Sequence, residues 1–326
     1  MEKNNFIQVP VINKTASLFI RDEENPTMVT SKLSKDFTQC LDAYNAGMEQ
    51  MIVTVKTDGT CGMVCKVQSQ PNQSQDLSLA DRDENNCYYL MRRQDIKIKS
   101  RNYQSVMNNG ICSIFCGMPC YITKIIRGSG KLERLEPFYI FQLTPDSKPD
   151  IDNGHVIGFT PLLHDFPDDK HAISAIDGFN GTTNVRFFTT TFNGSLNVGI
   201  RSVSAAELMD GLKIMTVEIM GSKISNKYGF TNNKHFINPH GSIVYPMDLP
   251  YCQDAPCGQA LYPKFDYDAI KEWFESEALN PWANVEGFVI HFLKSNKRFK
   301  VHRGHVGLEK TWVSRKTSGI NFLFES

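Results

Sequence analysis

Short β-forming runs separated by Asn-Gly and Asp-Gly pairs constrain the fold of this chain more than any other feature. Such pairs occur at Asn109-Gly110, Asn153-Gly154, Asp177-Gly178, Asn180-Gly181 and Asn193-Gly194. These dipeptides favour the tight turns that join antiparallel strands. Residues 185–192 and 196–203 flank the last pair and predict a hairpin. We therefore expect a chain built mainly of antiparallel strands.

Helical patterns occupy only a few segments. Phe37, Leu41 and Tyr44 recur at helical spacing, Ser204 is placed to cap a short helix, and residues 266–279 form an amphipathic pattern. Further strands are expected at residues 87–91, 213–220, 242–247, 285–292 and 298–302. The sequence therefore predicts an α+β protein, and its 326 residues suffice for one large or two ordinary domains.

One stretch carries a candidate nucleophile. Two β-rich runs flank Lys56-Thr57-Asp58-Gly59, which predicts a hairpin turn with Lys56 at the end of a strand. A lysine amine attacks a nucleotide α-phosphate only when it is neutral, so neighbours would have to lower its pKa. Asp58 is placed to orient the amine or a metal ion. The simpler alternative is an exposed lysine beside a turn.

Basic and acidic residues balance at 35 each, but they are segregated along the chain. One basic cluster runs from Arg92 to Arg101 and a second from Lys294 to Lys316, while residues 146–169 carry an acidic cluster. Segregated charge can form a basic groove for a phosphodiester backbone even at zero net charge. A solvated surface is the alternative interpretation.

Cysteine usage and hydropathy indicate an intracellular protein. Nine cysteines show no regular framework, residues 1–5 lack an apolar signal core, and polar residues interrupt the uncharged stretch 102–123. We expect a reducing compartment, cytoplasm or nucleus, and no membrane span. Cys112, Cys116 and Cys120 recur every fourth residue, a spacing that favours core cysteines over a zinc site.

Four segments resemble the motifs of a known superfamily. In chain order they are Lys56-Thr57-Asp58-Gly59, Val217-Glu218-Ile219-Met220-Gly221, Val285-Glu286-Gly287-Phe288-Val289-Ile290 and Phe299-Lys300-Val301-His302-Arg303. They resemble motifs I, III, IV and V of the covalent nucleotidyltransferases, which include ATP-dependent ligases and mRNA capping enzymes. That resemblance implies a nucleotidyltransferase fold in which two antiparallel sheets surround a nucleotide cleft.

Further segments narrow the resemblance. Those that contribute are Asp58-Gly59-Thr60-Cys61, Gly154-His155-Val156, Pro239-His240-Gly241 and Gly307-Leu308. Together they are similar to the 5′-to-3′ RNA ligase family that has a single-domain vertebrate member. The expected organisation is one domain over 1–326, with a motif-bearing core at 50–308, an N-terminal extension at 1–49 and a tail at 309–326. An OB domain after motif V is not expected.

The resemblance implies a role for each motif residue. Lys56 would become adenylylated, Glu218 would contact the ribose, and Lys300 would contact the α-phosphate. Asp58 and Gly59 belong to the nucleotide-binding turn, and Asp58 would join Glu286 at a Mg²⁺ or Mn²⁺ ion. Adenine would stack on Phe236 or Tyr228, although a core role is the simpler alternative for each ring.

Motif V departs from the pattern Lys-x-Lys, because His302 stands in place of the second lysine. Either His302 shares the phosphate contact, or Arg298 and Arg303 take it over and face the RNA. Arg92 or Arg93 would correspond to the arginine that meets the RNA end.

The implied function is an ATP-dependent RNA ligase that joins 5′-phosphate and 3′-hydroxyl RNA ends through a lysyl-AMP intermediate. ATP and Mg²⁺ or Mn²⁺ would be required, and a monomer is expected. Two alternatives are kept. The first is an RNA-capping guanylyltransferase, and the second is a catalytically silent protein that binds RNA ends.

Overall fold

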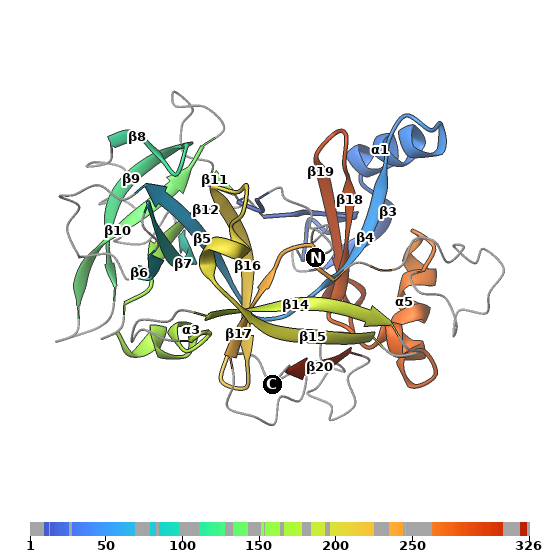
Figure 1. The fold of residues 1–326 in the computed structure, drawn as a ribbon. Coiled ribbons are helices and arrows are strands. Elements are labelled where there is room, and N and C mark those ends of the chain that lie inside the picture. The colour runs from blue at the N-terminus through green and yellow to red at the C-terminus, as the bar shows by residue number, and fades with distance from the viewer. Residues whose placement is uncertain are drawn as a thin grey trace.

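The structure is a computed structural model. It describes residues 10–12, 14–25, 28–68, 79–82, 85–97, 111–127, 133–142, 151–152, 154–163, 166–177, 184–192, 196–224, 235–243, 245, 263–308 and 320–324. This part of the chain is mixed α+β, with many strands and few helices (Figure 1). No helix in these ranges is long and apolar enough to cross a bilayer.

Two sheets position the site, and we name them the small sheet and the large sheet. The small sheet has the order β1 (Ala16–Ser17), β19 (Lys297–His302), β18 (Gly287–Phe292) and β4 (Met51–Lys56). The large sheet has the order β17 (His235–Pro239), β16 (Ile214–Gly221), β5 (Thr60–Gln68), β7 (Asn86–Lys97), β12 (His155–Pro161), β10 (Arg134–Phe141), β9 (Met118–Arg127) and β8 (Ile111–Phe115). Two short strands, β11 (Ile151–Asp152) and β6 (Leu79–Arg82), add to its β12 and β7.

Two further sheets and several helices complete the described part. The third sheet has the order β13 (Ile176–Asp177), β14 (Asn184–Phe192), β15 (Leu196–Val203) and β20 (Ile320–Phe324), and the fourth pairs β2 (Phe19–Arg21) with β3 (Val29–Leu33). The α-helices are α1 (Lys35–Asn45), α3 (Lys170–Ile173), α4 (Ala205–Leu208) and α5 (Tyr267–Glu275). The 3₁₀ turns are η2 (Pro167–Asp169), η3 (Ser276–Ala278), η4 (Pro281–Ala283) and η5 (Arg303–Val306).

Several local predictions are confirmed. Strands β14 and β15 pair antiparallel from Val185 opposite Val203 to Phe192 opposite Leu196. The Ser204 hydroxyl accepts a hydrogen bond from the Glu207 N–H and caps α4. Helix α5 buries Ile270, Trp273 and Phe274 on one face, as its periodicity predicts. These elements depend on neighbours in sequence, which is why the sequence identifies them.

The small and large sheets are antiparallel except at the two-residue edge strand β1, and further sheets stand beside the two that were expected. The described residues form four sheets, and two of the edge pairs are parallel: β1 with β19, and β15 with β20. The strand expected at residues 242–247 is also absent from the described residues of that range. Ile243 and Tyr245 instead make two backbone hydrogen bonds to Val55 and Val53 of β4, directly after a turn at His240-Gly241.

Lys56-Thr57-Asp58-Gly59 is not a hairpin turn, because the strands on its two sides belong to different sheets. Strand β4 pairs with β18 in the small sheet, and β5 pairs with β7 and β16 in the large sheet. Gly59 is required here by close packing, since a Cβ atom on it would collide with the Ile219 carbonyl oxygen and the Glu218 side chain. The motif therefore carries the chain from one sheet to the other.

The largest hydrophobic core cluster packs helices α1 and α5 against the small sheet. Its aromatic centre includes Phe37 of α1, Trp273 and Phe274 of α5, and Phe288 and Phe299 of the sheet, all of them buried. Phe37 meets Phe299 edge to face at 5.3 Å, and Trp273 meets Phe288 at 5.8 Å. Rings packed in this geometry contribute about 0.5–1.5 kcal/mol beyond their buried area. The strands that carry Lys56 and Lys300 therefore rest on a rigid layer.

Candidate active site

A cavity of about 310 Å³ lies where the two sheets meet. The small sheet contributes Lys56, Val289, His291 and Lys300 to its lining, and the large sheet contributes Cys61, Arg93, Glu218 and Asn238. The connecting residues Thr57, Asp58 and Gly59 line it as well. All four motif segments of the sequence thus contribute at least one residue to the lining of one cavity.

Lys56 and Glu286 come together because β4 and β18 are adjacent strands. Lys56 lies opposite Gly287 in the register, so Glu286 falls beside it at the start of β18. The Lys56 Nζ donates a hydrogen bond to the Glu286 Oε2 at 2.5 Å. Gly287 has no room for a side chain, since a Cβ atom there would meet the Val301 carbonyl oxygen and His302. Glu286 is not itself among the lining residues and reaches the cavity through Lys56.

The charge state of Lys56 differs from the sequence expectation. Burial by itself lowers the pKa of Lys56, but the negative charges of Glu286, Glu218 and Asp58 outweigh burial, and the net effect raises the pKa. The neighbours of Lys56 therefore do not provide the lowered pKa that attack by a neutral amine requires. Lys56 is an ammonium group in this state, and it needs a proton acceptor before it can act as a nucleophile.

Glu286 is placed to be that acceptor. Burial raises the pKa of Glu286 to about 7, with further upward contributions from Asp58 and Glu218, although the Lys56 charge acts in the opposite direction. A carboxylate with a pKa near neutrality takes up and releases a proton readily. The contact with Lys56 therefore joins a potential nucleophile to a potential base.

Lys300 supplies a second cation to the cavity. It lies on β19, opposite Val289 of β18, and both residues line the cavity. Burial lowers the pKa of Lys300 to about 8, and the nearby charges of Lys56, Arg21 and Arg93 lower it further. A cation crowded by other cations is stabilised when an anion enters between them. The site is thus arranged to bind a negatively charged group.

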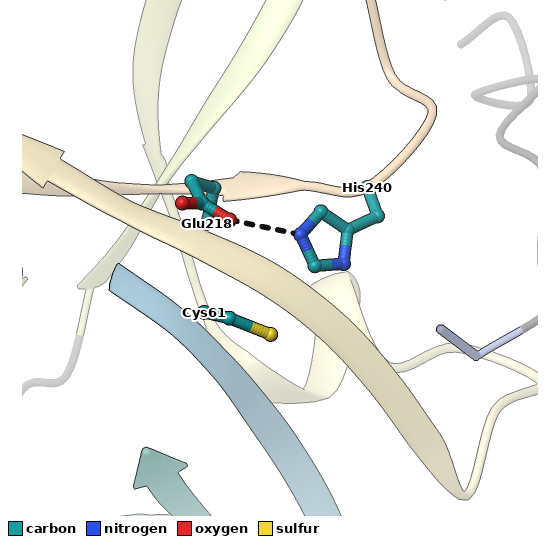
Figure 2. Close-up of side chains that lie close together, drawn as sticks. All are labelled: Cys61, Glu218 and His240. Carbon is teal, nitrogen blue, oxygen red and sulfur yellow. Dashed lines mark hydrogen bonds and ion pairs between the residues drawn. The ribbon is translucent and has the colours of Figure 1, made fainter. Parts of the chain in front are cut away.

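Glu218 projects from the large sheet toward the same cavity. It lies on β16, opposite Cys61 of β5 and Asn238 of β17. The His240 Nε2 donates a hydrogen bond to its carboxylate at 3.0 Å (Figure 2). The Asn238 side-chain amide in turn donates to the Thr57 hydroxyl at 3.0 Å, which ties the connection after Lys56 to β17.

Two expected nucleotide contacts lie away from the cavity lining. Phe236 is fully buried in the core, with its ring 5.5 Å from that of Phe322, so it has no open face for a base. His302 is half-buried and its ring lies 3.7 Å from that of His305. Burial lowers the pKa of His302 to about 2, with further lowering by His305, so it is a neutral imidazole. The alternative candidate Tyr228 lies outside the described residues.

The four arginines expected to meet RNA occupy different environments. Arg93 lines the cavity and pairs with Asp95 at 3.2 Å. Arg92 does not line the cavity and pairs at 3.1 Å with Asp169. Asp169 belongs to the acidic cluster of residues 146–169, but it is fully buried. Arg298 is half-buried and donates to the Pro10 carbonyl oxygen at 3.1 Å. Of these side chains only Arg93 borders the cavity.

Arg303 is buried and has a structural role, so the expectation that it contacts RNA is wrong. Its side chain is 3% exposed and donates to the backbone carbonyl oxygens of Val285, Ala283 and Phe274 at 2.9, 2.7 and 3.2 Å. It also pairs with Glu277 at 2.6 Å. These bonds hold α5, η4 and the start of β18 together. The sequence could not reveal this, because the acceptors are backbone groups of distant segments.

Arg303→Ala should therefore destabilise the protein by about 3–5 kcal/mol, because it leaves a buried carboxylate and several carbonyl oxygens without their partner. The measurement is urea unfolding followed by circular dichroism. The matched control is Lys297→Ala, which removes an exposed cation of β19 and should change stability by less than about 1 kcal/mol. Equal stability of Arg303→Ala and wild type would contradict the structural role.

Several residues of the site have no role predicted from the sequence. His291 of β18 lines the cavity and forms a hydrogen bond with Thr54 at 2.9 Å, while Cys61 and His240 lie beside Glu218. Among the described residues, Cys61, Glu218 and His240 are the only three potential metal ligands whose ligand atoms all lie within 4.8 Å of one another. Cys120 is buried, as expected for a core cysteine. No local signal identifies Cys61 or His240 as partners, since only strand register brings them together.

The carboxylates of the site also suit a hard cation. Asp58, Glu218 and Glu286 act on the same lysine, and carboxylate oxygens are the ligands that Mg²⁺ and Mn²⁺ prefer. No protein-family model matches the chain, and no curated protein matches it either. The functional assignment therefore depends on the chemistry of the site and on the resemblance of the four motif segments.

Proposed function

We propose that this protein is an ATP-dependent RNA ligase in which Lys56 forms the covalent bond to AMP. The observation that carries the proposal is the contact of Lys56 with Glu286 at the edge of a cavity that also holds Lys300 and Glu218. A lysine, a partner base and an anion-binding cation are what nucleotidyl transfer to an amine needs. The resemblance of the four motifs supplies the choice of nucleotide and of RNA.

The first step follows from the positions of the two charged groups. Lys56 transfers a proton from Nζ to the Glu286 carboxylate, and the neutral amine attacks the α-phosphate of ATP. A P–N bond forms, the P–O bond to the β-phosphate breaks, and pyrophosphate leaves. A pKa raised to about 7 makes Glu286 a better proton acceptor than an ordinary carboxylate, although the raised pKa of Lys56 opposes the transfer.

The other residues stabilise charge and position the nucleotide. Lys300 faces the cavity as a cation for the α-phosphate, and Glu218 accepts hydrogen bonds from the ribose hydroxyls. A Mg²⁺ or Mn²⁺ ion held by Asp58 and Glu286 would supply positive charge at the phosphates. The cavity volume of about 310 Å³ lies at the lower end of the roughly 300–1,000 Å³ that small-molecule sites occupy.

The later steps need RNA at the same cavity. AMP passes from Lys56 to the 5′-phosphate of one RNA end, and the P–N bond is exchanged for a P–O bond. The 3′-hydroxyl of a second end then attacks that phosphate, and AMP leaves. Arg93 borders the cavity and supplies a cation that can contact a phosphate of the RNA.

The experiment that tests the proposal is the intact mass of the full chain after incubation with a divalent cation and either ATP or GTP. The expected result is a gain of one AMP from ATP and no gain from GTP. A GMP adduct would favour an RNA-capping guanylyltransferase. The absence of any adduct, with RNA binding retained, would favour a catalytically silent protein that binds RNA ends.

Arg93→Ala should weaken RNA binding and lower the slope of log affinity against log salt by about 1, because each neutralised phosphate releases counterions. The measurement is fluorescence anisotropy of a 5′-phosphorylated RNA at several salt concentrations. Lys170→Ala removes an exposed cation of α3 outside the cavity lining and should leave the slope unchanged. An unaltered slope in Arg93→Ala would place Arg93 outside the RNA path.

A further inference from the structure

Cys61, Glu218 and His240 all line the cavity, and their side chains lie close together (Figure 2). They offer one sulfur, one oxygen and one nitrogen, and these ligand atoms all lie within 4.8 Å of one another. Each of the three side chains is partly buried. The group is distinct from the pair Lys56 and Glu286, which lies at the end of β4.

The register of the large sheet produces this arrangement. Glu218 of β16 is directly opposite Cys61 of β5 and, on its other side, opposite Asn238 of β17. His240 lies two residues beyond Asn238, and its N–H donates to the Thr216 carbonyl oxygen at 3.0 Å, which continues the pairing past the end of β17. Side chains two residues apart share a face, and directly opposite residues lie about 4.5–5.5 Å apart at Cβ. The three ligands are therefore fixed by backbone pairing.

We propose that Cys61, Glu218 and His240 bind a thiophilic divalent cation of the Zn²⁺ class. Zinc takes thiolate, imidazole and carboxylate ligands together, and sites with three protein ligands keep a fourth position open. At Zn–N and Zn–O distances of about 2.0–2.2 Å, tetrahedral ligand atoms are about 3.3–3.5 Å apart. The His240 Nε2 and the Glu218 Oε2, now 3.0 Å apart, need only a small separation to admit the ion.

The protons can be accounted for at each ligand. The ion replaces the thiol proton of Cys61, which leaves to solvent, and binds the sulfur as a thiolate. His240 gives its Nε2 lone pair to the ion and carries the ring proton on Nδ1. This Nδ1 makes no hydrogen bond with the described residues, so the change of tautomer breaks no existing contact. Glu218 exchanges its hydrogen bond from His240 for the bond to the ion.

The nearby charges do not exclude the ion. Burial raises the pKa of the Cys61 thiol to about 12, and the charge of Arg93 acts in the opposite direction, so the ion itself has to displace the thiol proton. Asp95 pairs with the same guanidinium at 3.2 Å and offsets its charge. Mg²⁺ is not the expected occupant, because it requires near-octahedral oxygen coordination and binds thiolates poorly.

This inference goes beyond the proposed ligase activity and does not require it. Glu218 is the residue assigned to the ribose, and one carboxylate cannot fully serve a nucleotide and a thiophilic ion at the same time. Zinc-class ions would therefore compete with the nucleotide for the cavity. The ion is also separate from the Mg²⁺ or Mn²⁺ that the carboxylates Asp58 and Glu286 would hold.

The test uses Co²⁺ as a spectroscopic probe on the full chain without any nucleotide. Wild type should develop a thiolate-to-cobalt charge-transfer band in the near ultraviolet and visible bands of tetrahedral intensity, and Zn²⁺ should abolish both. Cys61→Ser should remove the charge-transfer band. The matched control Cys116→Ser changes another half-buried cysteine and should retain it. Excess Mg²⁺ should not displace Co²⁺.

His240→Gln should weaken Co²⁺ binding by at least about ten-fold, since even loss of an outer contact to a metal ligand costs about 10–100-fold. Circular dichroism checks that each variant is folded. The proposal is overturned if folded wild type shows no thiolate band, if Cys61→Ser keeps it, or if Cys116→Ser loses it. Displacement of Co²⁺ by Mg²⁺ would likewise overturn it, because it would indicate a site made of oxygen ligands.

Discussion

Lys56→Arg should abolish the AMP adduct while the protein remains folded and binds RNA. A guanidinium keeps the positive charge beside Glu286 but cannot lose a proton near neutral pH, so it cannot attack a phosphate. Intact mass after incubation with ATP and Mg²⁺ measures the adduct, and peptide mapping of the wild type locates it. The expected effect is a loss to background.

The control for this variant is Lys297→Arg, at the exposed start of β19, which should form the adduct at the wild-type rate. Mapping of the wild-type adduct to any residue other than Lys56 would refute the assignment. Persistence of the adduct in Lys56→Arg would refute it as well.

A second variant at this position, Lys56→Ala, separates the first step from the last. RNA that already carries AMP on its 5′-phosphate needs only attack by a 3′-hydroxyl, which depends on positioning and charge stabilisation by Lys300, Glu286 and the divalent cation. Lys56→Ala should therefore seal pre-adenylylated RNA although it fails with ATP and 5′-phosphorylated RNA. Complete inactivity on the pre-adenylylated substrate, in a folded variant that binds RNA, would contradict this division.

Glu286→Gln should lower the rate of adenylylation by about 10²–10⁴-fold, the range expected for loss of a general base. Glutamine keeps the size of the side chain and a hydrogen bond to Lys56, but it accepts no proton. The measurement is the single-turnover rate of AMP transfer at saturating ATP, with circular dichroism as a check of folding.

The matched control is Glu272→Gln, an exposed acid of α5 that touches no cavity residue in the described contacts and should leave the rate unchanged. A near wild-type rate in Glu286→Gln would show that Glu286 only pairs with Lys56 and does not take up its proton. In that case the proton acceptor would have to be Asp58 or Glu218, the other two acids that act on Lys56.

The sequence by itself determined the parts of this protein that depend on nearby residues. The turn pairs and alternating patterns gave the β14–β15 hairpin, and apolar spacing gave α5 with its buried face. The side chains of Ser204 and Asp266 accept hydrogen bonds from backbone N–H groups two or three residues ahead. Both helix starts could therefore be predicted from the local sequence. Motif order pointed to Lys56, Glu218, Glu286 and Lys300 as one set, and the structure brings them to the same region.

Only the tertiary structure decided how distant segments meet. Lys56-Thr57-Asp58-Gly59 looks like a hairpin turn by composition, yet it joins two sheets, because β4 finds its partner in β18 and β5 finds its partners in β7 and β16. The sequence predicts an RNA contact for Arg303, but in the structure its guanidinium donates to carbonyl oxygens of three other segments. The strand pairings that build the site depend on the whole chain, since most of them join residues far apart in sequence. That is why the pKa of Lys56 and the meeting of Cys61 with Glu218 and His240 could not be predicted from local pattern.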